Sequence, residues 1–323
     1  MSTHISHIAG SEVLNIAGSG VLNIDIAGSG VLNIGLLPNA LVDGILIGLV
    51  YGLVAAGLAL IWGIMDIVNF AHGEHMLIAM YVTLFATAEF GVDPLFLLPV
   101  NAVILFVVGY ATYTVIIKRV MDAPVLAQVL STFGLLLVIR YGILYVAGPE
   151  TRQVEDFVFS GSTSILGISV SYPQVLTGVV SIATIAALFL ILERTTLGKA
   201  IRATAQDKQA AQVVGIDTSQ IYAIAWGIGL AVAGVAGTMV ATFYPIQPES
   251  TPATWTIAAF AAVALGGLGG VIGPVVGGVV IGLVENVGAT MLDASYRQLY
   301  VYVVLMAALI YQREGILNWV NNQ

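Results

Sequence analysis

The sequence predicts an all-α polytopic membrane protein with about eight or nine transmembrane helices, broken or re-entrant segments and an inverted repeat. Its 323 residues are 59% hydrophobic and only 9% charged, whereas charged residues make up roughly 25% of an ordinary soluble domain. So little polar surface cannot cover a soluble core, so lipid must surround most of the chain. The 36 glycines favour close packing between membrane helices.

The first 35 residues differ from the rest of the chain. Residues 8–34 repeat the pattern IAGSEVLN, IAGSGVLN, IAGSGVLN. No basic region precedes an apolar core, which argues against a signal peptide. We interpret residues 1–35 as a flexible or weakly β-forming N-terminal extension, and residues 36–323 as the transmembrane domain.

Long uncharged stretches define the spans of this domain. The first runs from Leu41 to Trp62, and its glycines at positions 44, 48 and 52 share one helix face, where a second helix can approach closely. The stretch 250–284 is too long for one span and is predicted to form two segments that meet at a break. Residues 148–172 are polar and are expected to form a loop or short hairpin. The remaining spans are expected at about 75–90, 95–117, 126–147, 173–192, 220–244 and 298–312.

Basic residues predict the orientation of the chain. Lys and Arg flanking membrane spans stay on the cytoplasmic side. Counting spans places Lys118, Arg119, the basic cluster at 194–208 and Arg313 on one side. We therefore expect a multi-pass protein of the cell (inner or plasma) membrane, with the N-terminus outside and the C-terminus in the cytoplasm.

The segment 193–218 is a polar island between two apolar spans. It holds four of the ten basic residues of the chain. Its interior is rich in Ala and Gln, which favours a short helix outside the bilayer. A helix presented to the cytosol in this way suits contact with a soluble partner.

A polar motif, IVNFAHGE at 67–74, follows the first span. Ionisable groups at membrane depth are costly and usually mark a pathway or an internal pair. Gly73 would let the backbone turn there. The pattern leaves open a solvated cytoplasmic turn with a helix N-cap. His72 and His75 lack further ligands at a usual spacing, so no metal is expected. The candidate pathway residues of this motif are Asn69, His72, Gly73 and Glu74.

A second break, GGLGGVIGP at 266–274, interrupts the last long apolar stretch. No Lys-Ser/Thr pair follows its glycines, so it is not a phosphate-binding loop, and the chain is expected to hold no nucleotide of its own. Backbone groups at such a break can bind substrate if the break lines a cavity. Tight glycine packing is an equally common explanation. The candidate pathway residues here are Gly266, Gly267, Gly269 and Gly270.

One basic residue, Arg140, lies in the middle of a predicted span. It could pair with Glu74 or Glu285, but snorkelling toward the outer interface is favoured. No catalytic constellation stands out, so the chain is not expected to be an enzyme. Its few basic residues lack aromatic interleaving, so no nucleic acid is expected as a partner.

Four segments together resemble a known family. These are the first span with FAHGE, STFGLLLVIRYGILYVAGPE, the island TTLGKAIRATAQDKQAAQVVGID, and AFAAVALGGLGGVIGPVVGGVVIGLVEN. They are similar to the LivH-type permease subunit of branched-chain amino acid ABC importers, and they follow the family's order from about residue 36 to the end. The repeat at 8–34 departs from the family pattern.

The resemblance implies an ATP-driven importer of leucine, isoleucine and valine. Its expected partners are an extracytoplasmic substrate-binding protein, a second permease of the LivM kind, and two ATPases of the LivG and LivF kind. The ATPases would bind ATP and magnesium, and this chain would hold no cofactor. Urea or short amides are alternative substrates. An ion-coupled secondary transporter is a different class, for which Glu74 and Glu285 are the plausible intramembrane carboxylates.

The resemblance also assigns a coupling loop at 193–218. Small residues there would allow the loop to seat in a groove of the ATPase, and the charged residues would contact it. The family pattern gives Ala210, Ala211 and Gly215, and the charged candidates are Arg202, Asp207 and Lys208.

Overall fold

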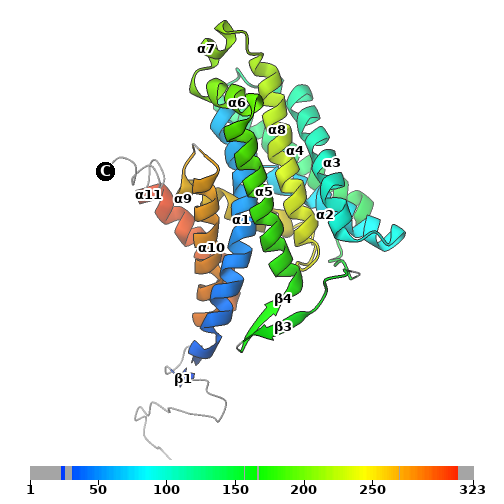
Figure 1. Ribbon diagram of the computed structural model, residues 1–323, viewed down its shortest axis with the longest axis vertical. Helices are drawn as coiled ribbons and strands as arrows, with labels where there is room; N and C mark the ends of the chain where they lie inside the picture. Colours follow the sequence, from blue (N-terminus) through cyan, green and yellow to red (C-terminus); the bar gives the residue numbers. More distant parts are fainter. Residues whose placement is uncertain (1–22, 26–30, 156, 166, 269, 312–323) are drawn as a thin grey trace, which may run out of the picture.

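The computed structural model describes residues 23–25, 31–155, 157–165, 167–268 and 270–311. The long helices form one bundle (Figure 1). In chain order they are α1 (Leu37–Met65), α2 (His72–Phe90), α3 (Pro94–Val115), α4 (Val125–Ala147), α5 (Tyr172–Arg194), α8 (Thr218–Val240), α9 (Thr251–Gly266), α10 (Ile272–Met291) and α11 (Arg297–Tyr311). The shorter elements are α6 (Thr196–Gln206), α7 (Lys208–Val213), η1 (Ile34–Leu36), η2 (Ile117–Arg119), η3 (Ala294–Tyr296), β1 (Asn23–Asp25), β2 (Val31–Asn33), β3 (Ser162–Ile165) and β4 (Ile168–Ser171).

Each predicted span corresponds to a helix, which confirms the all-α polytopic membrane fold. In the described part of the chain, 6 helices are long and apolar enough to cross a membrane, namely α1, α3 with η2, α4, α5, α8 and α10. The apolar helices α9 and α11 are shorter. The predicted total of eight or nine transmembrane helices stays a prediction.

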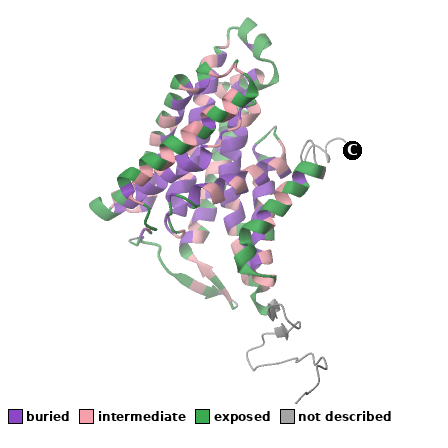
Figure 2. Cartoon of the chain, turned by 180° about the vertical axis from the view of Figure 1, so that it is seen from behind, coloured by how far each residue is buried: buried purple, intermediate pink, exposed green. Residues whose placement is uncertain are grey.

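The centre of the bundle is formed by α1 and α8. Helix α1 packs chiefly against α10 and α8, and α8 packs against α3 and α2. Figure 2 shows buried residues through the middle of the bundle and exposed residues on its outer helices and at its tip. Helix α4 is the most exposed candidate span, with 6% of its apolar window buried. Its apolar side chains face outward, as suits contact with lipid.

Glycines bring α1 and α10 into direct backbone contact. A Cβ atom added at Gly48 would lie 2.6 Å from the Cα atom of Val279. One added at Gly278 would overlap the backbone of Gly52. The predicted close approach along the glycine face of the first span is therefore confirmed.

Two antiparallel strand pairs complete the described chain. In β1 and β2, Asn23 pairs with Asn33. Residues 1–22 and 26–30 of the predicted N-terminal extension lie outside the described residues. In β3 and β4, Ser162 pairs with Ser171. The second pair confirms the hairpin expected within 148–172.

The chain reverses inside the bundle after α1. Asp66 ends that helix with a left-handed φ of 55°. The hydroxyl of Thr132, two turns into α4, donates to the Val68 carbonyl at 3.0 Å. The amide of Gly73 donates to Thr256 Oγ1 of α9 at 3.0 Å. Helix α2 therefore begins between other helices, and the predicted re-entrant segments stay a prediction.

A second interruption separates α9 from α10. Gly267 has a φ of 84°, and a Cβ atom at Gly266 would overlap Gly273. The helix ends therefore meet with no space for side chains. The helix interruptions lie at residues 66–71 and between Gly266 and Ile272, so each falls within or next to a predicted break, whose last three residues already belong to α2 or α10. The inverted repeat that would relate the two breaks stays a prediction.

Candidate functional site

The first candidate site is the polar cluster at the start of α2. Asn69 and His72 are 0% exposed and Glu74 is 1% exposed. Burial this complete excludes the solvated turn that the sequence left open. Arg140 Nη2 of α4 lies 2.5 Å from Glu74 Oε1. The preference for a snorkelling Arg140 was wrong, because a carboxylate buried this deeply requires a partner to offset its desolvation.

The rest of this cluster is packed tightly. Asn69 Oδ1 accepts from the Ala71 amide at 3.1 Å. His75 Nδ1 lies 2.6 Å from the Ala71 carbonyl oxygen. A Cβ atom at Gly73 would overlap Thr256 Oγ1 and the Pro252 carbonyl, so no side chain fits. The cluster joins α2, α4 and α9, and its place in a substrate pathway stays a prediction.

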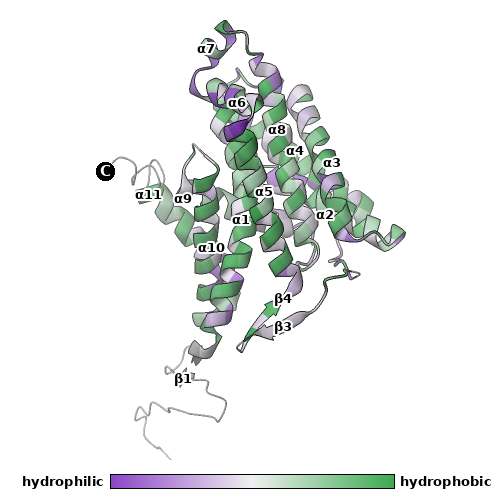
Figure 3. Cartoon of the chain, in the orientation of Figure 1, coloured by the Kyte–Doolittle hydropathy of each residue, from purple (hydrophilic) through white to green (hydrophobic). Residues whose placement is uncertain are grey.

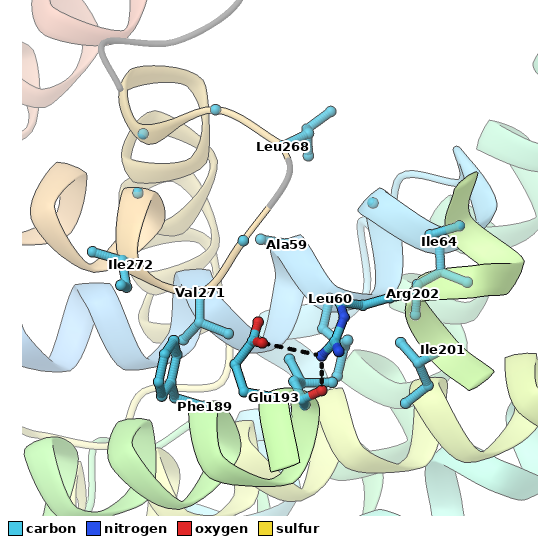
Figure 4. Close-up of a pocket in the computed structure, with 17 residues that line it drawn as sticks. Ala59, Leu60, Ile64, Phe189, Glu193, Ile201, Arg202, Leu268, Val271 and Ile272 are labelled. Atoms are coloured by element: carbon cyan, nitrogen blue, oxygen red, sulfur yellow. Dashed lines mark hydrogen bonds and ion pairs between the residues drawn. The ribbon is translucent and has the colours of Figure 1, made fainter. Parts of the chain in front are cut away.

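The second candidate site is a cavity of about 370 Å³ at the break between α9 and α10. Its walls come from α1, α5, α6 and the break itself (Figure 4). Gly266, Gly267 and Gly270 line it, and Gly269 lies outside the described residues. The lining includes none of the four polar-motif residues. The two predicted groups of pathway residues are therefore not brought together in this cavity.

One ion pair closes a side of this cavity. The Arg202 guanidinium of α6 lies 3.4 Å from Glu193 Oε2 and also donates to the Leu192 carbonyl (Figure 4). Both partners belong to the last turn of α5, so Arg202 folds α6 back onto that helix. The predicted coupling-loop residue thus contacts its own chain in this structure, and its contact with a partner stays a prediction.

The third candidate site is the α6–α7 tip, which protrudes from one end of the bundle (Figure 1). Figure 3 shows hydrophilic residues gathered on α6 and α7 beyond the hydrophobic body of the bundle. Asp207 Oδ1 accepts from the amides of Gln209 at 2.8 Å and Ala210 at 2.9 Å. This is an N-cap, which fixes the start of α7. Lys208 Nζ lies 3.9 Å from Asp122 Oδ1 and 5.9 Å from the Tyr222 ring centroid.

The outer surface of α7 is apolar at its end. Val213 is 86% exposed and Val214 is 74% exposed. Gly215 follows with a φ of 88°, which turns the chain back toward α8. Ala210 is exposed, whereas Ala211 is buried within the chain. Neither valine is among the residues predicted for the coupling loop, although two adjacent β-branched residues within a polar island are a recognisable signal.

Comparison with known proteins places the chain in a family. The family model described as branched-chain amino acid transport system / permease component matches residues 40–311. The high-affinity branched-chain amino acid transport system permease protein BraD of Pseudomonas aeruginosa is 30% identical over 292 residues, which cover 86% of this chain and 94% of BraD.

Two LivH proteins are similar as well. LivH of Salmonella typhimurium is 28% identical over 287 residues, covering 85% of this chain and 93% of the relative. LivH of Escherichia coli K12 is 27% identical over 288 residues, with the same coverage of 85% and 93%. With its multi-pass helical bundle and a family match over residues 40–311, the chain belongs to the family of permease components of branched-chain amino acid transport systems.

Proposed function

We propose that this chain is a permease subunit of an ATP-driven importer that takes up leucine, isoleucine and valine. Its partners would be a second, LivM-like permease, two LivG- and LivF-like ATPases that bind ATP and magnesium, and an extracytoplasmic binding protein. The α6–α7 tip lies in the cytoplasm in this proposal. The N-terminus is then outside and the C-terminus inside, as the basic residues indicate.

The observation that carries this proposal is the exposed end of α7. Val213 and Val214 are largely exposed at the tip of a short helix whose start is fixed by Asp207. An apolar surface presented on a rigid, polar-flanked element is typical of a protein contact. Arg202 attaches α6 to α5 and also lines the cavity at the α9–α10 break. A movement of the tip caused by the ATPases would therefore be transmitted to that cavity.

Uptake into proteoliposomes that hold the complete complex tests this proposal. Radiolabelled leucine should accumulate only with ATP on the side of the ATPases. ATP-dependent uptake of urea without leucine would keep the mechanism and change the substrate class. Leucine uptake at the same rate with and without ATP would overturn the proposal and favour an ion-coupled carrier.

A further inference from the structure

A second cavity has a volume of about 250 Å³. The helix ends that line it lie toward the end of the bundle opposite the α6–α7 tip (Figure 1). The cavity is lined by the N-terminal half of α1, the first turns of α5, α9 and α11, the last turns of α10, and the segment that follows α8. Ligand pockets for drug-sized molecules measure roughly 300–1,000 Å³, so this one suits a smaller metabolite. The charged residues that line it are Asp43, Glu285 and Arg297.

The charges in this cavity are arranged around Glu285, whose side chain is 5% exposed. Tyr51 donates its hydroxyl hydrogen to Glu285 Oε2 at 2.7 Å. Arg297 Nη1 lies 3.6 Å from Glu285 Oε1 and 3.4 Å from Asn286 Oδ1. Both contacts of Arg297 use one nitrogen of a guanidinium that has five N–H donors, and its side chain is 48% exposed. Arg297 can therefore donate hydrogen bonds to the carboxylate of an incoming ligand.

Negatively charged residues outnumber the positively charged residue in this cavity. Two carboxylates, Asp43 and Glu285, share the cavity with one guanidinium. Asp43 belongs to α1, on a different element from the other two charged groups. A ligand carboxylate on Arg297 would leave both protein carboxylates available to an ammonium group, so the set complements a zwitterion.

Three aromatic residues, Tyr51, Tyr244 and Trp255, line the cavity beside these charges and form an aromatic wall. The Trp255 ring lies 5.0 Å from the Tyr51 ring and 5.5 Å from the Tyr244 ring, centroid to centroid. Ile47 extends the same apolar lining. Such a surface suits an aliphatic side chain, and the ring faces also attract an ammonium group.

We infer that this cavity is a binding site for a zwitterionic α-amino acid with an aliphatic side chain. Arg297 takes the carboxylate, Asp43 and Glu285 take the ammonium, and the aromatic wall takes the side chain. The inference rests on the proposed function and names the place where the permease receives its substrate. It also separates amino acids from urea and amides, which carry no pair of opposite charges.

The absence of cysteine in this chain allows a direct test. Thr254 lines the cavity, and T254C introduces a single thiol there. The full complex is purified without the binding protein, and alkylation of this subunit by a small water-soluble maleimide is followed by mass spectrometry. Leucine should slow the alkylation. Leucinamide and 4-methylpentanoate, which each lack one charge, should need about ten- to a hundredfold higher concentrations for equal protection.

Variants separate the two charge contacts. R297Q should lower the preference for leucine over leucinamide and keep the preference over 4-methylpentanoate. D43N should do the reverse. E249Q, an exposed acid in the segment between α8 and α9, should change neither. If R297Q does not assemble, R297K keeps the positive charge without the planar fork and should give a partial loss.

Failure of this inference differs from failure of the proposed function. Equal protection by all three compounds would overturn the zwitterion assignment. The site would also be overturned if leucine did not protect the T254C thiol in a complex that still takes up leucine with ATP and binding protein. In that case the proposed function would stand. Selective protection by leucine in a complex whose uptake ignores ATP would support the site and overturn the ATP-driven function.

Discussion

Arg140 of α4 reaches across to Glu74 of α2, with 2.5 Å between Nη2 and Oε1. The carboxylate is 1% exposed and the arginine side chain 22% exposed. Helix α4 buries only Thr132 and Ala147, so this pair is a principal polar connection between α4 and the rest of the bundle. It anchors an otherwise peripheral helix at the point where the chain re-enters the bundle.

Removing one member of this pair should destabilise the protein strongly. R140Q leaves the buried Glu74 carboxylate without its counter-charge, at a cost of about 3 kcal/mol. The double variant E74Q/R140Q should recover most of the loss, because no unpaired charge remains. Thermal unfolding of the purified subunit in detergent measures both. R119Q, at an exposed arginine on η2, is the matched control, and an equal loss in R119Q would contradict the account.

The contact between α1 and α10 should not tolerate even one added methyl group. In G278A the new Cβ would overlap the backbone of Gly52, so α10 must move away, at about 1–3 kcal/mol. G142A is the control, since a Cβ there meets nothing within 4 Å and alanine favours the helix. Yield and unfolding temperature should fall for G278A alone. A normal G278A would show that the two helices do not touch here.

The N-cap of α7 should be needed for coupling. D207A removes the acceptor for two amides, at a cost of about 1 kcal/mol to a helix of only 6 residues. ATP-driven uptake should fall while insertion in the membrane is unchanged. D207N keeps an acceptor oxygen and should behave like the native chain. If D207N fails as badly as D207A, the charge matters and not the cap.

The exposed valines of α7 should carry the contact with the ATPases. V213D places a charge on the apolar tip and should abolish co-purification of the ATPase subunits from membranes. V158D makes the same change at a residue that is 78% exposed in the segment before β3, and should leave the complex intact. G215R should also impair assembly, because a bulky side chain is strained at a φ of 88°.

Hydrophobic runs and glycine spacing were enough to predict the helices of this fold. The break at 266–274 followed from an apolar stretch too long for one span, and the close approach at Gly48 from a spacing of four residues. These signals are local, and the lipid solvent makes them strong.

The candidate sites depended on contacts that no local pattern contains. Arg140 and Glu74 are separated by 66 residues, so the sequence could offer their pairing only as one alternative. The cavity around Glu285 draws on five helices, and its Tyr51 contact spans 234 residues. Arg202 was assigned to a partner, whereas its present contacts with α5 depend on how α6 folds back.

ATP-driven leucine uptake by three forms of the reconstituted complex tests the central claim most directly. The native complex and V158D should accumulate leucine only when ATP is present, and V213D should accumulate none above background. Full ATP-driven uptake by V213D would contradict the assignment of α7 as the coupling element. Uptake by the native complex that is the same with and without ATP would contradict the importer itself.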